Sequence, residues 1–239
     1  MTPKPKRQEV VLARFVARPN RFLVMADLED GRQVEAYLPN TGRLTHLTTP
    51  GRPLMLRCDG TASRRTEYTV IRAWDGCWVA LEASLAPRLL ADWLLAGHSL
   101  ATFGKVTEVK YEVTAEGHRL DLRVETEKGP VWVEVKSGGR SSGRTALLSA
   151  TPSTRGVSHL EALARLVARG EQAVAAFVIQ RPDVDSLLIG GDADQGWIEA
   201  VHSAREAGVT ITAFGCQVTE SEVRIDRELP VVWETPPTG

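Results

Sequence analysis

The first part of the chain, from Val10 to Leu85, is a succession of short runs in which apolar and polar residues alternate, as they do in half-buried β-strands. The runs cover residues 10–17, 21–28, 33–38, 53–58, 68–74 and 77–83. Asp30-Gly31 and Asp75-Gly76 separate neighbouring runs, and Gly tolerates the positive φ that a tight hairpin requires. The pattern predicts a small antiparallel β-barrel of the OB type.

The periodicity changes at Pro87, where apolar residues begin to recur at helical spacing and continue to Gly97. Beyond this helix the pattern predicts strands near 108–114, 119–125 and 131–136, a helix near 155–169, a strand near 173–180, a helix near 195–207, and strands near 209–214 and 217–226. The order α-β-β-β-α-β is typical of a mixed α/β layer with helices flanking a sheet. We therefore predict two domains, residues 1–85 and 86–239.

Charge is distributed unevenly between these two parts. The whole chain carries 29 basic and 30 acidic residues, which excludes the strongly basic profile of a histone-like binder. Residues 1–85 contain 13 Lys and Arg against 9 Asp and Glu, whereas the remainder contains 16 against 21. A basic front half and an acidic back half suit a phosphate-binding surface joined to a cation-binding site.

The cysteines and the apolar runs bear on the cellular setting. Cys58, Cys77 and Cys216 show no Cys-x-x-Cys or Cys/His ligand spacing, which indicates reduced thiols rather than disulfides or a structural zinc. No apolar run reaches the roughly 18 residues of a membrane span. We therefore expect a cytoplasmic protein with no membrane partner.

The chemistry is concentrated in residues 118–137, HRLDLRVETEKGPVWVEVKS. Leucines and valines alternate along both predicted strands, which places Asp121 on the polar face of the first strand and Glu134 and Lys136 on that of the second. Two carboxylates aimed at one point repel each other unless a cation lies between them, and Mg²⁺ or Mn²⁺ is the obvious candidate. Such a centre hydrolyses phosphodiesters, with Lys136 positioned to orient water or stabilise charge on phosphorus.

A simpler interpretation of Glu134 and Lys136 is that they decorate an exposed strand face, where alternating Glu and Lys are common. Asp121, in phase on the preceding strand, favours the catalytic interpretation. Glu108 stands at the start of a third strand. It is either a further acid of the site or an exposed strand-end charge.

Residues suited to nucleic acid occur in both parts of the chain. In the front half they are Arg14, Arg18 and Arg21, with Phe15 and Phe22 interleaved, and the turn Asn40-Thr41-Gly42. In the back half they are Arg119, on the face of Asp121, and Arg155 and His159, which lie four residues apart near a helix start. Strand alternation explains the phenylalanines as core, the turn is equally a corner of the barrel, and a single His near a helix start is more often structural.

The segment from Gly138 to Thr145, GGRSSGRT, has the spacing of a phosphate-binding P-loop. A P-loop opens directly into a long helix, however, and Pro152 interrupts this chain soon afterwards. Arg144 also stands in the position of the lysine that such a loop needs. We therefore expect a mobile loop over the metal site rather than a nucleotide site.

Taken together, these segments show that the chain resembles the sugar fermentation stimulation protein A family over nearly its full length. The resemblance is carried by RFVARPNRF (14–22), LPNTG (38–42), PG (50–51), DGCWVAL (75–81), EVKY (108–111), RLDLRVE (119–125), VEVKS (133–137) and PSTRGVSHL (152–160). It implies an OB-like N-terminal domain, a C-terminal domain of the PD-(D/E)xK nuclease fold, DNA binding and a link to the regulation of sugar use. Asp121, Glu134 and Lys136 stand where the acid, acid and lysine of that motif stand. Where the family usually reads Phe-Pro-Asp-Ala this chain reads Leu148-Ser149-Ala150-Thr151, so an acid is missing at position 150.

The leading functional prediction is a DNA-binding protein with a Mg²⁺-dependent, nuclease-like site in which Asp121 and Glu134 ligate the metal. The rival prediction is a non-catalytic DNA-binding transcriptional regulator that keeps the nuclease fold. An RNA substrate and a homodimeric state are both compatible with the sequence.

Overall fold

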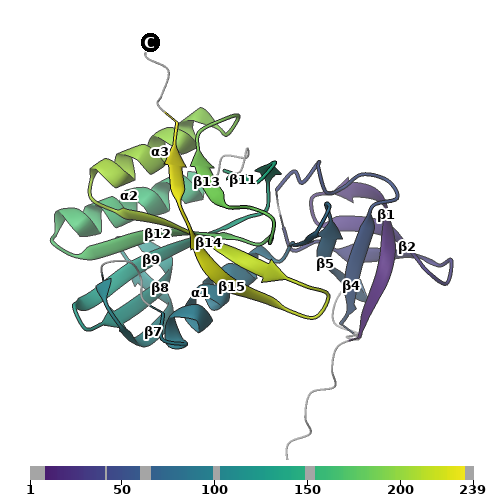
Figure 1. Ribbon diagram of the computed structural model, residues 1–239, viewed down its shortest axis with the longest axis horizontal. Coiled ribbons are helices and arrows are strands. Elements are labelled where there is room, and N and C mark those ends of the chain that lie inside the picture. Colours follow the sequence, from purple (N-terminus) through teal and green to yellow (C-terminus); the bar gives the residue numbers. More distant parts are fainter. Residues whose placement is uncertain (1–8, 41, 60–65, 99–102, 149–153, 235–239) are drawn as a thin grey trace, which may run out of the picture. The chain divides into compact units, whose positions relative to one another are not determined.

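The structure is a computed structural model that describes residues 9–40, 42–59, 66–98, 103–148 and 154–234. The chain divides into two compact units, residues 1–82 and 83–239 (Figure 1). Within the described ranges, no helix combines the length and the apolar character needed to cross a membrane.

Unit 1 is a β-barrel. Its strands are β1 (Val10–Asn20), β2 (Leu23–Leu28), β3 (Gln33–Tyr37), β4 (Pro53–Cys58), β5 (Tyr68–Trp74) and β6 (Trp78–Ala80). They hydrogen-bond in the order β3-β2-β1-β4-β5-β6, and a further parallel pairing between β3 and β5 closes the barrel. The predicted OB-type barrel is therefore confirmed.

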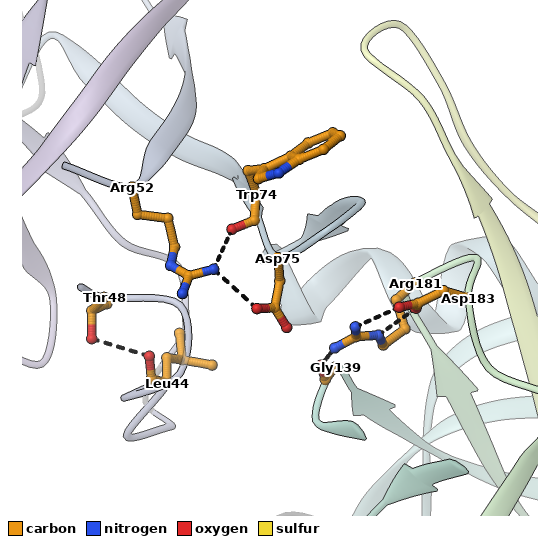
Figure 2. Close-up of polar contacts among 8 residues, drawn as sticks. All are labelled: Leu44, Thr48, Arg52, Trp74, Asp75, Gly139, Arg181 and Asp183. Carbon is orange, nitrogen blue, oxygen red and sulfur yellow. Dashed lines mark hydrogen bonds and ion pairs between the residues drawn. The ribbon is translucent and has the colours of Figure 1, made fainter. Parts of the chain in front are cut away.

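The barrel core is formed by the inward-facing residues, which alternate with outward-facing ones along each strand. Phe15, Val24 and Leu56 are at most 4% exposed. Gly31 and Gly76 have φ of 86° and 77°, so both predicted hairpin turns use the left-handed conformation that glycine permits. At the second turn Arg52 donates to the carbonyl of Trp74 at 2.6 Å and pairs with Asp75 at 2.9 Å (Figure 2).

The described residues of unit 2 form three α-helices and two sheets. Its elements are the 3₁₀ turn η1 (Ala83–Leu85), α1 (Ala86–Leu95), β7 (Val106–Ala115), β8 (His118–Thr126), β9 (Gly129–Gly138), β10 (Ser141–Ser142), β11 (Thr145–Leu147), α2 (Thr154–Ala168), β12 (Gln172–Ile179), β13 (Ser186–Ile189), α3 (Gln195–Glu206), β14 (Thr210–Val218), β15 (Val223–Leu229) and β16 (Val231–Trp233). The larger sheet has the order β15-β14-β12-β9-β8-β7. Its central strands β9, β12 and β14 are parallel, and both edges are antiparallel.

Helices cover both faces of this sheet (Figure 1). α2 and α3 pack on one face over Trp132, Ala175 and Phe177, and Leu160 and Leu163 of α2 are at most 1% exposed. The alternate residues of β9 point to the opposite face, where α1 packs against β7, β9 and β15. The predicted order α-β-β-β-α-β and its mixed α/β class are confirmed for the main sheet.

A second sheet, of order β10-β11-β13-β16, was not predicted, because its strands are only two to four residues long and have no clear period. The Gly138–Thr145 segment enters this sheet as a hairpin, in which Ser141 is the strand partner of Ala146. The side chain of Arg144 forms an ion pair with the carboxylate of Asp185. The segment is therefore a β-hairpin of the second sheet and not the expected loop, and its mobility stays a prediction. The strands predicted at 209–214 and 217–226 are β14 and β15, with the turn between them several residues later than expected.

Candidate functional site

Asp121 lies where the ladder around β8 is interrupted. The pairing of β8 with β9 runs from Thr126↔Gly129 to Leu122↔Val133 and ends there. On the other side, the register with β7 passes from Tyr111↔Leu122 to Val113↔Leu120, and Glu112 between them has φ of 55°. Among the described residues, neither neighbouring strand pairs with Asp121. Its Oδ2 instead accepts a hydrogen bond from the Val135 amide at 2.8 Å, which ties the carboxylate to β9.

Glu134 is buried in the centre of unit 2, with 3% of its surface exposed. It stands on β9 between two paired strands, on the face that α2 covers. Its Oε1 lies 2.6 Å from the Lys136 ammonium and 2.7 Å from Nδ1 of His159. Its Oε2 is buried and has no hydrogen-bond partner among the described residues. Because Glu134 is buried, it is not a charge that decorates an exposed strand face. Leaving one of its carboxylate oxygens buried and unpaired costs free energy, which a bound ligand would offset.

Burial is also the main cause of the raised pKa of Asp121. Loss of solvent, followed by the negative charge of Glu134, raises the pKa of Asp121 from 3.8 to about 6, against the opposing effects of the Val135 amide, Lys136 and His159. The two carboxylates thus share one partly desolvated volume, in which the charge of Glu134 disfavours the ionised form of Asp121. A divalent cation between them would reverse that repulsion.

His159 reaches the site from α2. It is 4% exposed, its Nδ1 faces Glu134, and its Nε2 lies 3.4 Å from Nε of Arg155 on the preceding turn. The ring of His118 packs edge-on against it, with centroids 5.4 Å apart. The approach to Glu134 is a close polar contact rather than an aligned hydrogen bond. The helix thus turns His159 into the sheet beside Glu134, and its contact with phosphate stays a prediction.

Two further residues of the site were missed in the sequence. Trp197 of α3 places its ring 5.9 Å from the Lys136 ammonium. Gln180, fully buried just after β12, donates from Nε2 to the Ser137 hydroxyl at 2.8 Å. Gln180 could have been identified in the sequence, because it is a polar residue directly after the apolar run of β12. No local signal distinguishes Trp197 from ordinary helix packing.

The carboxyl end of β9 is secured by Arg181. This side chain is 2% exposed and donates to the Gly139 carbonyl at 3.0 Å. It also forms a two-pronged ion pair with Asp183, at 2.6 and 2.8 Å (Figure 2). The segment that follows Lys136 and Ser137 is therefore held by charge-assisted hydrogen bonds.

Glu108 does not belong to this site. The register of β7 places it opposite Glu125, well along the strand from Asp121. Its side chain is exposed and lies 3.2 Å from Lys110. The prediction of a further acid is thus wrong, because antiparallel pairing moves the beginning of β7 away from Asp121. No group of three or more His, Cys, Asp or Glu side chains arranged to hold a metal occurs in the described ranges, and Ala150 lies outside them.

The basic residues predicted to bind nucleic acid differ in solvent exposure and in the contacts that their side chains already make. Arg119 is exposed and lies 3.3 Å from Glu112, and Arg155 is exposed at the start of α2. In unit 1, Arg14 is exposed and donates to the Gly51 carbonyl at 3.1 Å. Arg21 is exposed, and its guanidinium lies 5.6 Å from the centroid of the Phe22 ring.

Arg18 and Asn40 are engaged within unit 1. Arg18 donates to the carbonyls of Gly42, Arg43, Arg21 and Asn40 at 2.9, 2.5, 2.8 and 3.2 Å. Asn40 accepts from the Gly42 amide and donates to the Leu81 carbonyl. These contacts tie Asn40 and Gly42 into a corner of the barrel, and Thr41 lies outside the described residues. The phenylalanines differ: Phe15 is core at 4% exposure, whereas Phe22 is 44% exposed.

The donor set of the site fits a hard divalent cation. Asp121 and Glu134 supply carboxylate oxygens, one of which is buried and unpaired. Mg²⁺, Mn²⁺ and Ca²⁺ favour such ligands and commonly complete their shells with water and backbone carbonyls. Lys136 lies beside Glu134 and balances its charge, and His159 lies on the same carboxylate oxygen, where an imidazole can carry or orient protons.

Comparison with known proteins agrees with this architecture. The family model "SfsA N-terminal OB domain" matches residues 16–81, and "Sugar fermentation stimulation protein RE domain" matches residues 84–222. A sugar fermentation stimulation protein homolog of Acetivibrio thermocellus is 34% identical, covering 94% of this chain and 97% of that protein. The homolog of Chloroflexus aurantiacus is 35% identical over 93% of this chain and 85% of that protein.

A solved structure described as "The structure of Pyrococcus Furiosus SfsA in complex with Ca2+" matches with a TM-score of 0.79 and 27% identity, covering 94% of this chain and 96% of that one. The match spans both units, as do the two family models together. The chain belongs to the sugar fermentation stimulation protein family.

Proposed function

We propose that this protein is a divalent-metal-dependent nuclease that acts on DNA. The observation that carries the proposal is the buried Glu134, whose unpaired Oε2 lies in the same desolvated site as Asp121. A fold gains no stability from a buried carboxylate with an unpaired oxygen beside a second, partly buried carboxylate whose pKa it raises, so this arrangement favours a ligand that needs both. The Ca²⁺ named for the Pyrococcus furiosus relative is consistent with a cation at such oxygens.

In this proposal Asp121 and Glu134 hold the cation, which when bound would polarise a phosphoryl oxygen and lower the pKa of water. Asp121 is kept in position by the Val135 amide, so its geometry is set before a cation binds. Lys136 lies 2.6 Å from Glu134 and carries the positive charge that stabilises negative charge developing on phosphorus. His159, on the other side of Glu134, orients that carboxylate.

The proposal is tested by incubating the full chain with supercoiled, linear and single-stranded DNA in Mg²⁺ or Mn²⁺ and in chelator. We expect metal-dependent cleavage that Glu134→Gln reduces about a hundredfold or more, in the range found when a charge-stabilising group is removed. Glu108→Gln is the matched control, because Glu108 is an exposed acid of the same sheet. It should cleave like the parent. Cleavage retained in Glu134→Gln would point to a contaminating nuclease.

A second candidate function is a DNA-binding regulator without catalysis. The observation in its favour is that no third acid or imidazole joins Asp121 and Glu134 as a ligand group in the described part of the chain. DNA binding that survives chelator, with no cleavage in any metal, would establish it. The regulation of sugar use that the family name suggests would then act through binding alone.

A further inference from the structure

Two aromatic side chains and an arginine form an exposed group at one end of the unit 1 barrel. Phe22 lies in the turn between β1 and β2, and Tyr37 ends β3. Their rings are nearly parallel, at 20°, with centroids 6.4 Å apart. The guanidinium of Arg21 lies 5.6 Å from the Phe22 centroid. Phe22 is 44% exposed and Tyr37 is 37% exposed.

Backbone contacts hold these rings in place. The Leu38 amide donates to the Phe22 carbonyl at 2.9 Å, and the Phe22 amide donates to Asn20 Oδ1 at 2.9 Å. Tyr37 is paired with Leu23 in the β2–β3 ladder. Both rings therefore project from fixed backbone, which lowers the entropy lost when a flat ligand settles on them.

The barrel does not need these rings for its core. Tyr37 is flanked by Ala36 and Leu38, which are at most 1% exposed, so strand alternation turns the tyrosine outward. An exposed pair of large rings gives up the free energy that their burial would provide. A flat apolar ligand that lies parallel to both planes would recover part of it.

Positive charge lies on one side of the pair. Arg21 lies against Phe22, and Arg43 is exposed in the next loop, whose carbonyls Arg18 holds beside the Arg21 backbone. Aromatic faces flanked by guanidinium groups bind nucleic acid by base stacking and phosphate contact. In a duplex the faces of the bases are already covered by their neighbours, so such a surface distinguishes unpaired bases from paired ones.

We propose that Arg21, Phe22 and Tyr37 form a stacking platform for unpaired nucleobases, so that unit 1 prefers single-stranded over duplex nucleic acid. The inference rests on the proposed function and narrows its substrate to strands with exposed bases. Trp74 provides the contrast within the same barrel. It is 39% exposed, but it packs edge-on against Trp78, and the guanidinium beside it, that of Arg52, is already paired with Asp75.

The test uses the full chain carrying Glu134→Gln, in chelator, so that binding is measured without cleavage. Fluorescein-labelled oligo-thymidylate and oligo-uridylate of about 12 nucleotides, and a duplex of the same length, are titrated by anisotropy. Replacing Phe22 and Tyr37 together by Leu removes both π faces and keeps apolar bulk. We expect single-strand affinity to fall about tenfold and duplex affinity to change less than about twofold. Trp74→Leu should bind like the parent.

Arg21→Gln provides a second measurement that does not depend on the fold of the double variant. It should weaken single-strand binding and lower the slope of log affinity against log salt by about one. Loss on both thymidylate and uridylate supports recognition of the base face, and loss on one alone supports the platform with a sugar preference. Unchanged single-strand affinity in both the double variant and Arg21→Gln overturns the platform. If the protein without the Glu134→Gln change nevertheless binds and cleaves DNA in metal, the proposed function stands without the platform, whereas a protein that binds neither single strands nor duplex removes both.

Discussion

Replacing Asp121 by Asn should stabilise the metal-free protein. The change removes a charge and keeps an oxygen that can accept from the Val135 amide, as Oδ2 of Asp121 does at 2.8 Å. Raising the pKa of this carboxyl from 3.8 to about 6 corresponds to about 3 kcal/mol of destabilisation once the carboxyl is ionised. Asp121 keeps some contact with solvent, which reduces the effect, so we expect the free energy of unfolding to rise by about 1–2 kcal/mol.

The effect has a definite pH dependence. Below the unfolded-state pKa of 3.8 the carboxyl is protonated in both states, and Asp121 contributes its full stability. As pH rises through the folded-state pKa of about 6, the folded state must release its proton against the environment, and that stability is lost. Asn at position 121 does not titrate. The difference in stability between Asp121→Asn and the parent should therefore be small at about pH 4 and reach its maximum above about pH 7.

Urea unfolding followed by tryptophan fluorescence in chelator, at several pH values, measures this difference. Saturating Mn²⁺ should then reverse the order, because ligand binding stabilises only the parent, whose carboxylate can hold the cation. A variant that is less stable than the parent above pH 7 in chelator, or a difference that does not change with pH, would refute the reasoning. Either result would mean that Asp121 is an ordinary satisfied carboxylate.

Three other changes have calculable outcomes. Mn²⁺ affinity, measured by isothermal titration, should fall as pH drops below about 6, approaching tenfold per pH unit, because protons compete for Asp121; an affinity independent of pH would exclude this carboxylate as a ligand. Arg18→Met should lower the free energy of unfolding by about 1–3 kcal/mol in urea titrations, because four backbone carbonyls of unit 1 lose their donor; no loss would show that water replaces the guanidinium fully. Leu163→Ala, at a fully buried position of α2, should cost about 2–5 kcal/mol in the same assay, and a cost below about 1 kcal/mol would show that the core collapses around the gap.

The sequence by itself determined the element types and the identity of the two central acids. Alternation along residues 119–125 and 131–136 is strong because one face of each strand is filled by Leu and Val that are at most 7% exposed. This pattern placed Asp121 and Glu134 on neighbouring strands without any knowledge of the fold. The strands of the second sheet were not predicted, because two to four residues are too few to show a period.

Only the tertiary structure decided which residues meet these acids. His159 stands on a helix that the sequence places correctly, but its direction depends on how α2 packs over β9. The register of β7 with β8, set by pairing across a turn, removed Glu108 from the site. The exposure of Phe22 and the engagement of Arg18 likewise depend on how the barrel closes. Local sequence reports the period of a strand or helix, whereas register and packing are set by contacts between residues distant in the chain, and those contacts assemble the site.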